Sequence, residues 1–138
     1  MRLHILARGR IGRGPEAELV GRYTGRMTWP VAVTEFADTA PFPAAGGAIT
    51  VALDERGAAW RSADLARRLG AWRDEGIREC RFLLGAANGL SDAERGAADH
   101  LLSFGPATWP HLLARAMLAE QLYRATAILA GHPYHREG

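Results

Sequence analysis

The segment Leu101–Glu137 constrains the fold of this 138-residue chain more than any other part of the sequence. Pro110 is well placed to open a helix, because proline at the first helical position needs no N–H partner and already has a helical φ. We expect the helix to run to about Ala130, since Gly131 ends it and Pro133 prevents its continuation. The fold must therefore accommodate one long helix near the carboxyl end.

Apolar residues lie on nearly all sides of this helix, which predicts burial on more than one side. They are Leu112, Leu113, Met117, Leu118, Leu122, Tyr123, Ile128 and Leu129. In so short a chain, we expect a second copy of the protein to supply part of the cover, as a homodimer. Arg115, Glu120 and Arg124 interrupt the apolar run, and charge in hydrocarbon is costly, so the helix is not expected to span a membrane. The spacing of Glu120 and Arg124 favours an ordinary ion pair.

Strand and helix patterns alternate along the rest of the chain. The expected strands are Arg2–Ala7, Val31–Ala37, Ala48–Asp54, Glu79–Gly85 and Leu101–Phe104. The expected helices between them are Pro15–Met27, Ser62–Arg73 and a segment from Ser91, a capping residue, to about His100. This order predicts an α/β fold with a mostly parallel sheet and helices on both faces. The length and the 48% hydrophobic composition predict one domain, residues 1–138.

The turn Gly9–Gly14, between the first strand and the first helix, is rich in glycine and arginine. Free N–H groups and the helix dipole make such a turn a candidate anion site. The spacing G-x-x-G-x-G does not match the dinucleotide fingerprint, so a nicotinamide-dependent oxidoreductase is disfavoured. Arg8, Arg10 and Arg13 predict contacts to an RNA backbone, and a flexible surface loop is the alternative.

All 17 basic residues are arginine, which suits phosphate contact, but a codon bias toward GC-rich triplets explains that usage equally well. The single cysteine, Cys80, excludes an internal disulfide and fits a reducing compartment. No signal peptide is evident, so we expect a cytoplasmic protein. No metal site is expected either, because Pro133 separates His132 from His135 and no cysteine or carboxylate cluster joins them.

The run T-x-P-H-x-L-x-R-x-x-L-x-E-Q-L-Y-R-A begins at Thr108, and H-P-Y-H-R-E follows near the chain end. Together they closely resemble the ribosomal large-subunit pseudouridine N3-methyltransferases, small knotted enzymes of the SPOUT superfamily. The resemblance implies a C-terminal trefoil knot and a homodimer that pairs through the knotted regions. It also implies S-adenosylmethionine as cofactor and N3 of a pseudouridine in 23S rRNA, within the ribosome, as the target.

Ligands of open α/β sheets bind beyond the carboxyl ends of the strands. By resemblance, three such ends form the cofactor pocket here. The expected cofactor-binding residues are Leu53, Gly85, Ala86, Gly105, Pro106, Ala107, Thr108, Trp109 and Pro110. Ala86 stands where relatives carry glycine, and Asp38–Gly47 replaces a longer segment that contains a helix in the family.

Methylation of an imide nitrogen requires that the nitrogen lose its proton and meet an aligned methyl group. On this basis Arg124, Tyr134 and His135 are the candidate catalytic residues, and Arg136 joins the predicted RNA contacts. The shortened segment and the extra methyl of Ala86 leave one alternative from another class open. It is a non-catalytic protein of the same fold that binds RNA or the ribosome.

Overall fold

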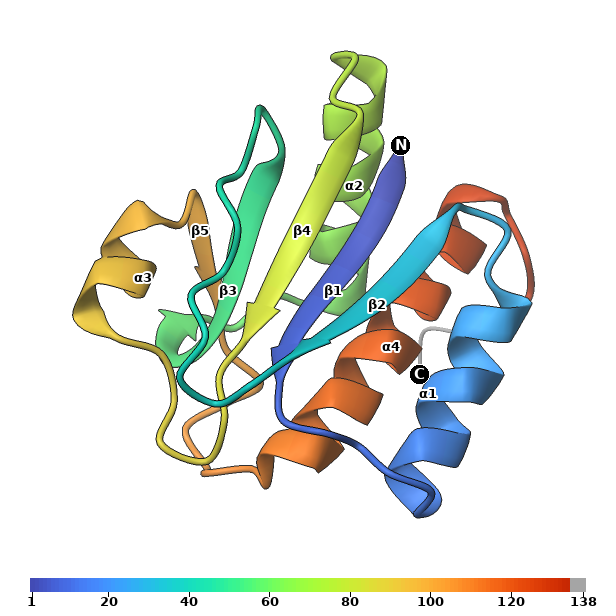
Figure 1. Ribbon diagram of the computed structural model, residues 1–138. Coiled ribbons are helices and arrows are strands. Elements are labelled where there is room, and N and C mark those ends of the chain that lie inside the picture. The colour runs from blue at the N-terminus through green and yellow to red at the C-terminus, as the bar shows by residue number, and fades with distance from the viewer. Residues whose placement is uncertain (135–138) are drawn as a thin grey trace.

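The computed structural model describes residues 1–134, and its centre is a five-stranded sheet (Figure 1). The strands are β1 (Arg2–Arg8), β2 (Val31–Phe36), β3 (Ile49–Ala58), β4 (Glu79–Leu84) and β5 (His100–Leu102). Their order is β2-β1-β4-β3-β5, and every neighbouring pair is parallel. The predicted parallel α/β sheet is confirmed.

Three helices cover one face of the sheet: α1 (Pro15–Arg26), α2 (Ser62–Asp74) and α4 (His111–Leu129). Leu3, Ile5 and Phe82 from the strands pack there with Leu118 and Leu122 of α4, all fully buried. Helix α4 lies between α1 and α2 and contacts both (Figure 1). The sheet and two helices of the same chain therefore account for much of the apolar surface around α4.

On the opposite face lie the short helix α3 (Asp92–Ala97) and the extended segment 37–48. Arg8 donates from Nη2 to the carbonyl of Ala40 at 2.8 Å, and its guanidinium lies 4.2 Å from the ring centroid of Phe42. Arg81 donates to the carbonyl of Pro43. Two buried arginines of the sheet thus hold the proline-rich segment against this face, where the resemblance predicts that a helix is missing.

Two predicted boundaries are wrong. β3 does not turn at Asp54 but continues to Ala58, with a shift in its register against β5 between Leu53 and Ala58. α3 ends at Ala97, and His100 already belongs to β5. In both cases pairing with a distant strand decided the local structure.

The cap at the start of α3 is confirmed, because Ser91 Oγ accepts from the amide of Glu94 at 3.1 Å and the Glu94 carboxylate accepts from the amide of Ser91 at 2.9 Å. No helix in the described part of the chain is long and apolar enough to cross a membrane. Strand order alone does not test the knot, which stays a prediction from the resemblance.

Candidate cofactor and substrate site

A cavity of about 720 Å³ lies beside residues 53–56 of β3 and at the carboxyl ends of β4 and β5. Its walls are this part of β3, the loops that follow β4 and β5, and the first turn of α4. Eight of the residues predicted to bind the cofactor line it: Leu53, Gly85, Ala86, Gly105, Ala107, Thr108, Trp109 and Pro110. Pro106, the ninth, is not among the lining residues. The sequence thus located the two loops after β4 and β5 correctly, whereas the predicted loop at Leu53 is part of β3, and cofactor binding by these residues stays a prediction.

The wall after β4 is a tight turn closed by an antiparallel bridge between Ala86 and Gly89. A Cβ on Gly85 would lie 2.5 Å from the carbonyl carbon of Gly89 and 2.6 Å from its oxygen. Those distances are far below a normal contact, so only glycine fits at position 85. The requirement comes from the turn itself, which sets the shape of the wall.

The wall after β5 turns at Gly105, whose φ of +105° is rarely adopted by other residues. The side chain of Ser103 holds this turn, accepting from the amide of Gly105 at 3.1 Å and donating to its carbonyl at 3.0 Å. Among the described residues, no atom outside Gly105 and its two chain neighbours lies within 4 Å of the position that a Cβ on Gly105 would occupy. With Leu53 and Trp109 as apolar walls, the cavity has the open backbone and the size that a nucleoside-type cofactor requires.

Two charged residues of the cavity were not singled out from the sequence. Asp54 accepts from the amide of Arg56 at 2.9 Å and from Nη1 of Arg95 at 3.3 Å. Arg95 also donates to the carbonyl of Leu90 at 2.5 Å, so it joins α3 to the cavity wall. Asp54 lies within β3 rather than at its end, and nothing in the sequence pairs it with an arginine 41 positions away.

The glycine-rich turn places Arg10 and Arg13 on the surface, where RNA contact stays a prediction. Arg8 does not join them. It is 8% exposed, and its guanidinium pairs with Glu94 on the opposite face of the sheet, which argues against the predicted RNA contact. The amide of Ile11 donates to the Glu35 carboxylate at 2.8 Å, so a carboxylate of the chain itself already occupies part of the anion site.

The structure does not bring Arg124 or Tyr134 to the cavity of the same chain. Tyr134 packs edge-on against Tyr123 at 4.7 Å between ring centroids, and its hydroxyl lies 3.3 Å from Glu120 Oε1. Arg124 donates from Nε to the same Glu120 oxygen at 2.7 Å. The predicted ion pair within α4 is confirmed, and the beginning of the tail folds back onto this helix.

The other predicted tail residues, His135 and Arg136, lie outside the described residues. Among residues 1–134, no three or more His, Cys, Asp or Glu side chains are grouped so that they could hold a metal ion.

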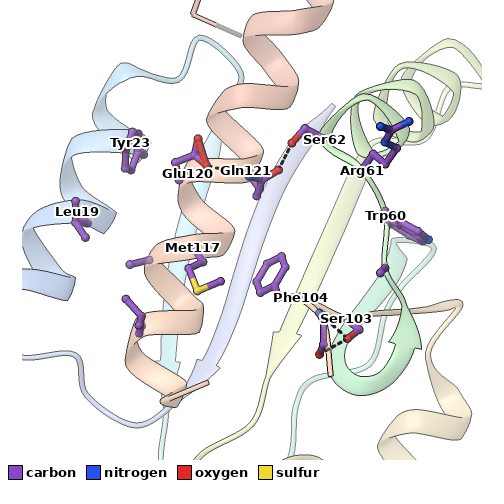
Figure 2. Close-up of a pocket in the computed structure, with 14 residues that line it drawn as sticks. Leu19, Tyr23, Trp60, Arg61, Ser62, Ser103, Phe104, Met117, Glu120 and Gln121 are labelled. Atoms are coloured by element: carbon purple, nitrogen blue, oxygen red, sulfur yellow. Dashed lines mark hydrogen bonds between the residues drawn. The ribbon is translucent and has the colours of Figure 1, made fainter. Parts of the chain in front are cut away.

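Tyr134 adjoins a second hollow, of about 580 Å³, which we call the α1–α4 hollow (Figure 2). Leu19 and Tyr23 of α1 face Met117 and Glu120 of α4 across it, and Trp60 and Phe104 close the far side. Gln121 accepts a hydrogen bond from the Ser62 hydroxyl at 2.6 Å within it. Its lining also includes residues 103–105, so one loop separates this hollow from the cavity at the ends of β4 and β5.

In parallel α/β sheets, a cavity of this size at the carboxyl edge is the usual place for a nucleotide-like ligand. The sequence profile of the predicted SPOUT methyltransferases matches residues 1–135, and the chain belongs to this family. SPOUT methyltransferases use S-adenosylmethionine, and the cavity walls described above fit that cofactor.

Curated relatives match the chain along its whole length. A protein from Zymomonas mobilis named ribosomal RNA large subunit methyltransferase H is 61% identical over 142 residues, with both chains fully covered. A protein of the same name from Novosphingobium aromaticivorans is also 61% identical, over 141 residues.

Two solved structures share the fold at low sequence identity. A probable methylase family protein from Haemophilus influenzae superposes with a TM-score of 0.64 at 10% identity, over 99% of this chain and 70% of that one. A probable methyltransferase from Bordetella pertussis gives 0.60 at 14% identity, over 91% and 96%.

Proposed function

We propose that this protein methylates the RNA of the large ribosomal subunit, at N3 of a pseudouridine in 23S rRNA. The observation that carries the proposal is the cavity between β3 and the carboxyl ends of β4 and β5, in a chain 61% identical over its length to a large-subunit rRNA methyltransferase. Bound S-adenosylmethionine supplies an electrophilic methyl group. The protein then has to hold the target nitrogen in line with that methyl and exclude water. Such a protein would work in the cytoplasm, where ribosomes are made.

The loops of the cavity have distinct roles in this proposal. The turns at Gly85 and Gly105 would offer backbone N–H and C=O groups to the adenine of the cofactor, and Leu53 and Trp109 would provide apolar contacts for it. The cavity also holds the carboxylate of Asp54, paired with Arg95, which can accept a hydrogen bond from a ribose hydroxyl.

We infer that the protein works as a homodimer through the α1–α4 hollow. Its walls are mostly apolar, and Leu113 and Met117 of α4 remain only partly buried within one chain. Light scattering should find a dimer at micromolar concentration. A stable, folded monomer there would refute the inference.

We propose that the chain end, from Tyr134 onward, completes a substrate site. Within one chain Tyr134 contacts Glu120 and Tyr123, whereas the cavity is lined by α4 only as far as Ala114. Six residues of helix correspond to roughly 9 Å. This separation favours action of the tail on the cavity of the partner subunit.

Deleting Tyr134 onward should leave folding and cofactor binding intact and lower methyl transfer by orders of magnitude. A truncated protein that methylated at the full rate would contradict this role of the tail.

Calorimetry with S-adenosylmethionine and with NAD tests the cofactor, and transfer of a labelled methyl group to unmethylated ribosomes tests the reaction. Mass spectrometry of the digested RNA then identifies the base. Cofactor binding and N3-methylation together support the proposal. Ribosome binding without cofactor binding would support the non-catalytic alternative instead.

A further inference from the structure

Arg115 is the largest fully buried side chain among the described residues, at 1% exposure, and it lies one helical turn after His111. Its Nη1 donates to Glu35 Oε2 at 2.6 Å. Its Nη2 donates to two backbone carbonyls at the end of β1, those of Arg8 at 3.2 Å and Gly9 at 2.9 Å. A single guanidinium thereby joins α4 to the last residue of β1 and to β2.

Glu35 extends this connection to the glycine-rich loop, residues 9–14. The carboxylate oxygen that receives Arg115 also accepts the amide of Ile11 at 2.8 Å. The Ile11 amide, followed by the Arg115 guanidinium, lowers the pKa of Glu35 below its ordinary value, so the carboxylate is charged at neutral pH. The loop is therefore fixed to α4 through one charged pair.

The same loop adjoins the cofactor cavity. A Cβ built on Gly9 would lie 3.6 Å from Nε2 of His111, and His111 lines the cavity. Gly9 has a φ of +93°, which lets the backbone turn at this point. Arg10 and Arg13 lie on the surface of this loop. Movement of the loop would therefore change how far these two arginines are from the cavity.

Stability alone does not require an arginine at this position, because well-packed apolar residues are often as stabilising as a buried ion pair. The planar guanidinium instead fixes the relative orientation of the segments it joins, since its donors bind two carbonyls and a carboxylate at the same time. We propose that Arg115 and Glu35 are positioning residues that hold the glycine-rich loop in register with the cofactor cavity, so that RNA bound on Arg10 and Arg13 presents its target base at the methyl group. This inference rests on the proposed function.

The first experiment compares Arg115→Lys with Arg81→Lys. Arg81 is a matched control, because it is also buried and donates to a side-chain oxygen, of Thr50, and to a backbone carbonyl, of Pro43, on the opposite face of the sheet. Lysine keeps the charge at both sites but cannot reach several acceptors at once. A loss of stability that both variants share is the effect of replacing any buried arginine. A difference between the two variants is the effect of Arg115 on the loop.

Limited digestion with trypsin measures the loop directly, since the loop contains Arg10 and Arg13. In Arg115→Lys, cleavage after these residues should accelerate about tenfold over wild type, while cleavage after Arg67 on α2 stays unchanged. In kinetic assays, KM for the RNA should rise about tenfold, with kcat and the cofactor Kd within about twofold of wild type. Arg81→Lys should change none of these. Equal digestion and equal KM in the two variants would refute the inference.

Glu35→Gln is the second variant and decides the question if Arg115→Lys does not fold. Glutamine can still accept from the Ile11 amide, so a smaller increase in cleavage and a smaller rise in KM than in Arg115→Lys are expected. Wild-type cleavage and wild-type KM in this variant would overturn the proposal. If the wild-type protein does not methylate RNA, the proposed function fails, whereas the comparison by trypsin still decides whether Arg115 holds the loop.

Discussion

Replacing Gly85 by alanine tests whether the turn after β4 sets the shape of the cofactor cavity. The added Cβ would meet the backbone of Gly89 at 2.5 and 2.6 Å, whereas an ordinary contact begins near 3.4 Å. The turn must therefore shift by most of an ångström, and a backbone cannot rotate away as a flexible side chain does. Overpacking of this kind costs about 1–3 kcal/mol.

The expected change in melting temperature follows from the chain length. At roughly 2.1 cal/mol/K per residue, 138 residues have an unfolding entropy near 0.29 kcal/mol/K, so 1 kcal/mol corresponds to roughly 3–4 °C. Gly85→Ala should therefore lower the melting temperature by about 3–10 °C. Because the displaced turn forms a wall of the cavity, the Kd for S-adenosylmethionine should also rise by about tenfold.

Gly21→Ala is the matched control. Gly21 lies inside α1, and among the described residues a Cβ there would meet no atom within 4 Å beyond the neighbouring backbone of α1, so alanine should stabilise the helix by about 0.5–1 kcal/mol. Calorimetric melting and titration with the cofactor measure both effects in both variants. If Gly85→Ala melted and bound like the control, the turn would not be constrained as described, and the reasoning would be wrong.

Three further substitutions test other parts of the structure. Gly105→Val places a branched residue at a φ of +105° beside the open cavity, and titration should show cofactor affinity weakened by roughly tenfold or more, so unchanged affinity in a folded variant would place the pocket elsewhere. Arg8 lowers the pKa of Glu94 below 4.5, so the stability from this pair is complete above pH 4.5 and is lost as the pH falls through the lowered value. Glu94→Gln should therefore cost about 1.5–3 kcal/mol at neutral pH in denaturant unfolding and weaken the dependence on acid pH, whereas an unchanged acid profile would contradict the pairing. Burial, aided by a hydrogen bond with Tyr23, raises the pKa of Tyr134 from 10.0 to about 12, so its stabilising effect is present below pH 10 and is lost as the pH rises through about 12. Ultraviolet titration of Tyr134→Phe should lack the late tyrosinate component of the wild-type protein, and a wild-type curve without such a component would argue against the packing of Tyr134 on α4.

Local sequence signals determined most of the element order. These signals act within a few residues of their own positions, so the sequence displays them directly. They include the proline before α4, the glycine after it, and the cap formed by Ser91 and Glu94. The parallel sheet followed from the alternation of strands and helices. Where a long-range pairing competed, as in the extension of β3 to Ala58, the local signals predicted the wrong boundary.

The two cavity loops after β4 and β5 could also be predicted, because ligands of parallel sheets bind at the carboxyl ends of strands whatever the side chains are. The partners of the charged residues could not. Arg8 faces Glu94 rather than solvent, and Asp54 meets Arg95, because the order of the strands brings together residues 86 and 41 positions apart.

The elements that cover the apolar sides of α4 also could not be predicted from the sequence. The sequence established that the helix is covered on several sides, but only the tertiary structure decided that α1 and α2 of the same chain provide much of that cover. Hydrophobic burial is proportional to area and has no direction, so a sequence specifies how much apolar surface must be covered without specifying what covers it.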